Sequence, residues 1–166
     1  MAVMRTCAIR KSSGFTLIEI LVVSAIIAIL LGLAVVKLEF SETSRLNGAA
    51  DDLAQRLEAA RDEAVVRGQP VAFSSDGQGY QFWVSDAAQN EWVALTSSDS
   101  IATRKFANGI SLNAMRVNGL PRPLGERLVF APSGLTESFA LTLTSESSAA
   151  EVFADALGRV DTRHAQ

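Results

Sequence analysis

The feature that most constrains this chain is a long apolar run from Phe15 to Val36, in which Thr16, Glu19 and Ser24 are the polar residues. As a helix rising 1.5 Å per residue, the run would reach about 33 Å, enough to cross a hydrocarbon core of roughly 30 Å. It carries no charge after Glu19. The run therefore predicts a membrane-spanning helix.

A short basic leader precedes this run. Residues 1–14 contain Arg5, Arg10 and Lys11 and no acid. Positive charge on this side predicts that the N-terminal end stays in the cytoplasm and the remainder is translocated. A cleaved secretory signal peptide, with small residues at 32–34 as its cleavage site, is the alternative. Against it, the apolar segment is longer than an ordinary signal-peptide core of roughly 7 to 15 residues, and Glu19 lies inside it.

The junction between leader and run carries a resemblance to a known family. The stretch Gly14-Phe15-Thr16-Leu17-Ile18-Glu19-Ile20-Leu21-Val22-Val23 resembles the processing site of type IV pilins and type II secretion pseudopilins. The resemblance implies that a prepilin peptidase, which is also an N-methyltransferase, cuts between Gly14 and Phe15 and methylates the new amine of Phe15. Glu19 would then be the fifth residue of the mature chain.

Glu19 is the residue that we expect to direct subunit assembly. The amine of Phe15, with an ordinary pKa of about 8, is largely cationic at neutral pH. A charge buried without a partner costs several kcal/mol, so pairing of Glu19 with a neighbour's amine would penalise wrong registers between stacked helices. The alternative is a tolerated interfacial carboxylate that reaches the lipid headgroups.

An apolar stripe predicts that the helix continues beyond the membrane. Its members recur at helical spacing and are Leu46, Ala50, Leu53, Leu57, Ala60 and Ala64. Gly68 and Pro70 predict that the helix ends there. The stripe is short for a coiled-coil seam, so we expect it to pack against the protein's own sheet.

After Pro70 the pattern changes to short strands separated by turns. The expected strands are Val71–Ser74, Tyr80–Ser85, Glu91–Thr96, Ile110–Val117, Arg127–Ala131, Phe139–Ser145, Glu151–Ala154 and a last piece at Arg159–Asp161, and Asn118–Gly125 is expected to be a loop. The predicted fold class is α+β and type IV pilin-like, a long helix packed on an antiparallel β-sheet domain. The predicted segments are a leader at 1–14, a transmembrane and assembly helix at 15–37, an amphipathic continuation at 38–69 and a periplasmic β domain at 70–166.

The β region resembles the H-type minor pseudopilins of type II secretion systems. The resemblance lies in Tyr80-Gln81-Phe82-Trp83, in Trp92, in Leu128-Val129-Phe130-Ala131-Pro132-Ser133-Gly134 followed by Phe139, and in Ala156-Leu157-Gly158-Arg159-Val160-Asp161. It implies a single-pass protein of the bacterial inner membrane, a structural subunit at or near the tip of the periplasmic pseudopilus. The implied partners are the prepilin peptidase, the major G-type and minor I-, J- and K-type pseudopilins, the inner-membrane secretion platform and, as further candidates, exoprotein substrates. We interpret Trp83 and Trp92 as a cross-strand core pair, with a binding surface as the alternative.

Enzymatic chemistry is not expected from this sequence, and neither is a metal or cofactor. His164 is the only histidine and is expected to lie in a frayed C-terminus, and Cys7 is the only cysteine. Gly77-Gln78-Gly79 is interpreted as a hairpin turn, and the acidic pair Asp51 and Asp52 as solvated helix surface.

Net charge separates the two functions that remain. The chain has a net charge of -3, and loss of the three leader cations would leave -6. A minor type IV pilin that assists pilus assembly or captures DNA is the alternative function. DNA capture needs clustered Lys and Arg, so nucleic acid is not an expected partner.

Overall fold

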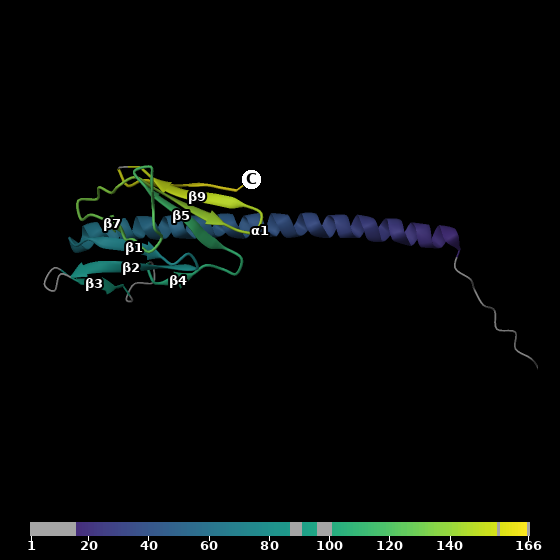
Figure 1. Cartoon of the computed structure of the whole chain (residues 1–166), viewed down its shortest axis with the longest axis horizontal. Helices are drawn as coiled ribbons and strands as arrows, with labels where there is room; N and C mark the ends of the chain where they lie inside the picture. Colours follow the sequence, from purple (N-terminus) through teal and green to yellow (C-terminus); the bar gives the residue numbers. More distant parts are fainter. Residues whose placement is uncertain (1–15, 87–90, 96–100, 156, 166) are drawn as a thin grey trace, which may run out of the picture. The chain divides into compact units, whose positions relative to one another are not determined.

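The computed structural model describes residues 16–86, 91–95, 101–155 and 157–165, except for the side chains of residues 32–41. The chain forms two compact units, Met1–Leu38 and Glu39–Gln166. Helix α1, Leu17–Arg67, contributes residues to both units (Figure 1). The prediction that the helix continues beyond the apolar run is therefore confirmed, and neither Gly32 nor Gly48 ends it.

Helix α1 ends where the sequence predicts. Gly68 follows its last residue with φ +65, and the Gly68 amide donates to the Val65 carbonyl at 3.3 Å. A left-handed residue directly after a helix favours glycine, which has no Cβ to clash with the preceding turn. The chain then turns into the first strand at Val71.

Within the described residues ten strands follow, and they form two antiparallel sheets (Figure 1). They are β1 Val71–Ser75, β2 Gly79–Asp86, β3 Glu91–Ala94, β4 Arg104–Lys105, β5 Ser111–Val117, β6 Leu120–Arg122, β7 Leu128–Phe130, β8 Phe139–Thr144, β9 Ala149–Ala154 and β10 Val160–Arg163. Sheet A has the order β3-β2-β1-β7, with β4 also paired to β2, and sheet B has the order β10-β9-β8-β5-β6. The expected α+β class, a helix followed by antiparallel strands, is confirmed.

Two strands were missed by the sequence analysis. The segment Asn118–Gly125 is not a loop throughout, because β6 lies within it and pairs with β5. Asn118 and Gly119 have φ 51 and 77, the left-handed pair that a two-residue hairpin turn requires. Pro121 lacks an amide hydrogen, yet it is accommodated because β6 is the last strand in the order of sheet B. The other missed strand is β4, which is two residues long.

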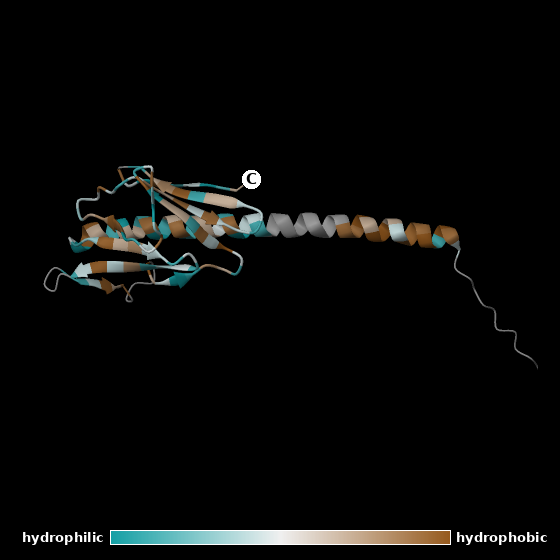
Figure 2. Cartoon of the chain, in the orientation of Figure 1, coloured by the Kyte–Doolittle hydropathy of each residue, from teal (hydrophilic) through white to brown (hydrophobic). Residues whose placement is uncertain are grey.

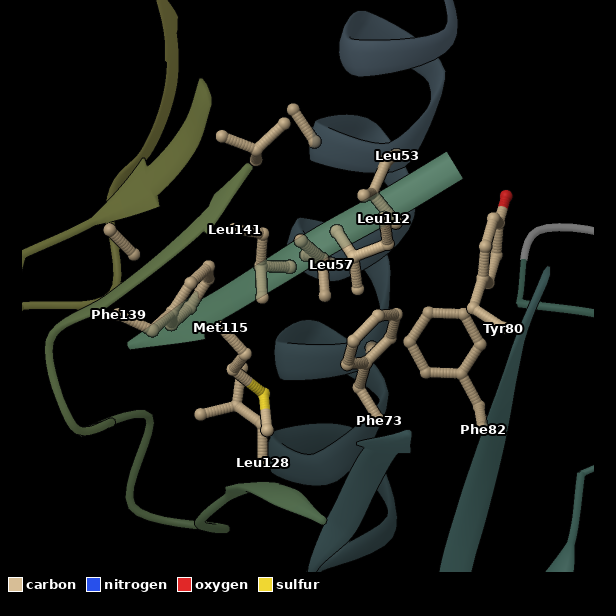
Figure 3. Close-up of a cluster of buried hydrophobic side chains, with 14 of the residues drawn as sticks. Leu53, Leu57, Phe73, Tyr80, Phe82, Leu112, Met115, Leu128, Phe139 and Leu141 are labelled. Carbon is tan, nitrogen blue, oxygen red and sulfur yellow. The ribbon is translucent and has the colours of Figure 1, made fainter. Parts of the chain in front are cut away.

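One hydrophobic core joins the C-terminal half of α1 to both sheets. All six residues of the predicted stripe are completely buried: Leu46, Ala50, Leu53, Leu57, Ala60 and Ala64. Figure 3 shows Leu53 and Leu57 of α1 in one cluster with Phe73 and Phe82 from sheet A and Leu112 and Leu141 from sheet B. The stripe thus packs against the protein's own sheets and is not a coiled-coil seam.

Candidate functional site

The predicted processing site, Gly14 and Phe15, lies outside the described residues. Glu19 is described and occupies the first turn of α1. Its amide donates to Thr16 at the N-terminus of the helix, at 3.1 Å to the carbonyl and 3.3 Å to Oγ1. A carboxylate is favourable in this turn because of the positive end of the helix dipole. Among the described residues, no cation forms an ion pair with Glu19, and its side chain is exposed.

The N-terminal part of α1 exposes apolar side chains all around. The exposed large residues here are Leu17, Ile18, Ile20, Leu21, Val22, Val23, Ile26, Ile27, Ile29, Leu30 and Leu31. Figure 2 shows this part of the helix mostly in the colour of hydrophobic residues. A helix that is apolar on all sides is typical of a segment that lies against lipid or against other apolar protein surfaces.

In the part of the chain that the structure describes, no helix has a stretch that is both long enough and apolar enough to span a membrane.

Two polar clusters hold α1 against the sheets, where the sequence analysis expected solvated carboxylates. The Asp52 carboxylate accepts hydrogen bonds from Arg56, at 2.8 Å from Nε and 3.1 Å from Nη2. The hydroxyl of Tyr80 on β2 also donates to this carboxylate, at 3.2 Å. The hydrogen bond from Arg56 is the main cause that lowers the pKa of Asp52, and burial raises the pKa of Tyr80. Asp52 therefore ties the helix to sheet A.

Asp51 makes the corresponding contact with sheet B. The Thr162 hydroxyl of β10 donates to Asp51 Oδ1 at 2.9 Å, and His164 Nε2 lies 2.8 Å from the same oxygen. Ala165 and Asn47 are also hydrogen bonded, with the Ala165 amide 2.9 Å from Asn47 Oδ1. The expectation of a frayed end at His164 is wrong, because these contacts fix the described C-terminal residues to the helix.

The two tryptophans do not belong to the core, and that interpretation is also wrong. Tyr80 and Phe82 of β2 point inward, so alternation places Trp83 on the outer face of sheet A, where it is partly exposed. Trp92 of β3 lies on the same face and is also partly exposed. The guanidinium carbon of Arg127 lies 4.6 Å from the centroid of the Trp83 ring and 5.6 Å from that of Trp92.

A cavity of about 440 Å³ opens beside this cluster. Its lining comes from β1, β2, β4 and the segment before β7, and includes Ser74, Asp76, Tyr80, Arg104 and Lys105. The predicted hairpin turn at 77–79 is confirmed, since Asp76 Oδ1 accepts the amides of residues 78 and 79 at 2.9 and 2.7 Å.

Glycine at position 79 sets the position of β4. A Cβ there would meet the Arg104 carbonyl oxygen at 2.6 Å, closer than real contacts allow. Its absence lets β4 approach β2 and places Arg104 and Lys105 at the cavity. Within the described ranges, no group of three or more His, Cys, Asp or Glu residues is arranged to hold a metal ion.

Comparison with known proteins identifies the family. The family described as Type II transport protein GspH matches residues 49–158, and the prokaryotic N-terminal methylation motif matches residues 9–35. The second match includes Gly14, Phe15 and Glu19. Type II secretion system protein H of Pseudomonas aeruginosa is 40% identical over 87 residues, which are 52% of this chain and 51% of that protein. The chain thus matches about half the length of this curated relative.

Solved structures agree in fold. The minor pseudopilin EpsH of Vibrio cholerae superposes with a TM-score of 0.64 at 17% identity, over 75% of this chain and 96% of that one. GspH of Escherichia coli superposes with a TM-score of 0.57 at 17% identity, over 74% of this chain and 90% of that one. The type IV minor pilin FimU of P. aeruginosa superposes with a TM-score of 0.50 at 18% identity, over 76% of this chain and 96% of that one. The type IV pilin-like α+β fold is thereby confirmed. Because the family match covers more than half of the chain, this protein belongs to the GspH family of type II transport proteins.

Proposed function

We propose that this protein is a minor pseudopilin of a type II secretion system, a structural subunit at or near the tip of the periplasmic pseudopilus. In that role it helps to drive folded exoproteins across the outer membrane. The observation that carries the proposal is the family match over residues 49–158, which coincides with the β domain and the part of α1 packed on it. The methylation motif at residues 9–35 supports it independently.

The proposal assigns a role to each of the N-terminal residues. A prepilin peptidase and N-methyltransferase cuts after Gly14 and methylates Phe15. The leader of residues 1–14 is removed, residues 15–37 anchor the chain in the inner membrane, and the β domain from residue 70 lies in the periplasm. The exposed apolar surface of α1 supports this anchor, because lipid or neighbouring helices would remove it from water.

Glu19 is proposed to set the register of assembly. Its carboxylate is exposed in the first turn of α1, one turn from the amine that processing would create. When processed subunits stack their helices away from lipid, each subunit supplies a methylated amine at Phe15. The amine of a neighbouring subunit is therefore the proposed partner of the Glu19 carboxylate. Pairing avoids the cost of a buried lone charge and disfavours other staggers. The proposed partners are the G-, I-, J- and K-type pseudopilins and the inner-membrane platform, with exoproteins as further candidates.

A minor type IV pilin is the second candidate function, because FimU shares the fold. The two functions predict different losses when the gene is deleted: loss of exoprotein export for a pseudopilin, and loss of pili or DNA uptake for a minor pilin. Deletion of the gene should leave exoproteins in the periplasm, and the full-length gene should restore them to the medium. Normal export together with lost pili or lost DNA uptake would overturn the secretion proposal.

The processing step has its own test. Mass spectrometry of protein purified from membranes should find an N-terminus at Phe15 that carries one added methyl group. Mature protein that begins elsewhere would overturn the assignment of Gly14 and Phe15 while leaving the export result unaffected.

A further inference from the structure

The outer face of sheet A has an unusual charge for this protein. We define this face by Ser74, Gln81, Trp83, Trp92, Lys105 and Arg127, which strand alternation and register place on the side away from α1. Lys105 and Arg127 are its charged residues in the described part of sheet A, and both are exposed. Hydrogen bonds from two turn amides lower the pKa of the Asp76 carboxyl, and Lys105 lies near enough for its charge to help lower it. A cationic face on a chain of net charge -3 indicates an acidic partner.

Arg127 is held in a geometry that suits a carboxylate. Its guanidinium carbon lies 4.6 Å from the centroid of the Trp83 ring and 5.6 Å from that of Trp92, close enough for a cation–π contact with both rings. The N–H donors of a guanidinium form a planar fork that matches the two oxygens of a carboxylate.

The cationic face continues into the cavity. The Trp83 indole N–H donates to Ser74 Oγ at 2.8 Å, and Ser74 also lines the cavity together with Lys105 and Arg104. Asp76 is the one acid among the described lining residues, and two turn amides already bind its Oδ1. Among the described residues, Arg104, Lys105 and Arg127 against Asp76 give the face and cavity together an excess of positive charge.

We infer that the outer face of sheet A and its cavity dock an acidic, partly apolar segment of a partner protein. The inference deepens the proposed function and rests on it, since a subunit of an assembly has such partners. Tryptophan and arginine are the residues that most often dominate protein–protein binding. A nucleic acid fits this face less well, because three cations neutralise few phosphates and Arg127 already occupies the ring surfaces on which bases would stack.

The test uses the full-length protein in detergent micelles and two fluorescent peptides. The acidic probe alternates Glu and Leu, and the neutral probe alternates Gln and Leu, so partition into micelles affects both alike. Fluorescence anisotropy should show the acidic probe binding about tenfold tighter or more, a ratio that corresponds to about 1.4 kcal/mol. The preference should shrink as salt increases, because exposed charges are screened.

Two variants locate the binding. Arg127→Glu should weaken binding of the acidic probe about tenfold or more. Arg116→Glu is the matched control, because Arg116 is exposed on β5 of sheet B and its reversal changes the net charge equally. It should change the affinity less than twofold, the effect expected of distant, screened charge. Lys105→Glu is a second variant on the same face and should also weaken binding, even if Arg127→Glu misfolds.

The results that would overturn the inference are distinct from a failure of the proposed function. Equal affinity for the two probes, or equal loss in Arg127→Glu and Arg116→Glu, would show that the face is not the docking site. Tighter binding of duplex DNA than of the acidic probe would assign the face to nucleic acid instead. By contrast, normal exoprotein export after deletion of the gene would refute the secretion role whatever the titration shows.

Discussion

Leu57→Ala tests whether the helix stripe is the core of this domain. Leu57 is completely buried and lies in the cluster that joins α1 to both sheets (Figure 3). Replacing a buried leucine by alanine costs about 2–5 kcal/mol, through lost transfer free energy and the cavity left behind. A helix held between two sheets has little freedom to close that cavity, so we expect about 3–4 kcal/mol. Domains of this kind have a total unfolding free energy of about 5–15 kcal/mol, so this loss is large.

The assay is thermal unfolding followed by near-ultraviolet circular dichroism, in which the partly buried Trp83 and Trp92 report on the β domain. The expected loss corresponds to a melting temperature lowered by about 10 °C. Glu58→Ala is the matched control, because Glu58 is the next residue on α1 and is exposed. It should change the unfolding free energy by less than about 0.5 kcal/mol.

A coiled-coil seam would behave differently under the same change. The monomer would then melt as the wild type does, and Leu57→Ala would weaken association that depends on protein concentration. A melting temperature no lower than that of Glu58→Ala would refute the assignment of Leu57 to the domain's own core.

Four further outcomes are expected. Gly14→Val should leave full-length precursor on a blot and abolish export, because a side chain at the cut site obstructs the peptidase; normal mature protein would contradict the processing proposal. Glu19→Ala should still be inserted and cleaved, but it should no longer crosslink to partner pseudopilins, and wild-type crosslinking and export would show that Glu19 is a tolerated charge. Duplex DNA should bind the full chain no better than weak background at physiological salt, as an anisotropy titration would measure, since the three cations Arg104, Lys105 and Arg127 neutralise few phosphates. The lowered pKa of Asp52 means that its contact with Arg56 stabilises the fold above the ordinary carboxyl pKa of about 3.9 and is lost as pH falls through the folded-state value. Asp52→Asn should therefore lose less stability than the wild type on acidification below about pH 4, and an identical loss would show that Asp52 contributes nothing to this pH dependence.

Sequence reasoning was most successful where periodicity alone decides structure. The spacing of Leu46, Leu53 and Leu57 indicates one apolar helix face, and all three are buried. Runs of strand-forming residues between turn signals placed β1, β2, β5, β8 and β9 within one or two residues of their observed ends. The roles proposed for Gly14, Phe15 and Glu19 stay predictions, because the structure describes Glu19 alone of the three and without a partner molecule.

The candidate docking site could not be predicted, because it depends on residues far apart in the chain. Alternation along β2 separates Phe82 from Trp83, but a run of aromatic residues does not tell which of the two faces is inward. Packing against α1 decides it, since Phe82 then fills the core and Trp83 turns outward. Arg127 reaches the tryptophans because β7 pairs with β1 beside β2, an order that nothing local in the sequence indicates.

By itself, the sequence determined the long helix, its apolar and amphipathic parts, most of the longer strands and the resemblance to the family, because each depends on residues close together in the chain. The tertiary structure alone decided the partners of neighbouring polar residues. Asp51 and Asp52 are adjacent and looked equivalent, yet one binds Thr162 of sheet B and the other Tyr80 of sheet A. Successive helix residues point about 100° apart, so only the placement of a sheet on each side gives each carboxylate its own partner.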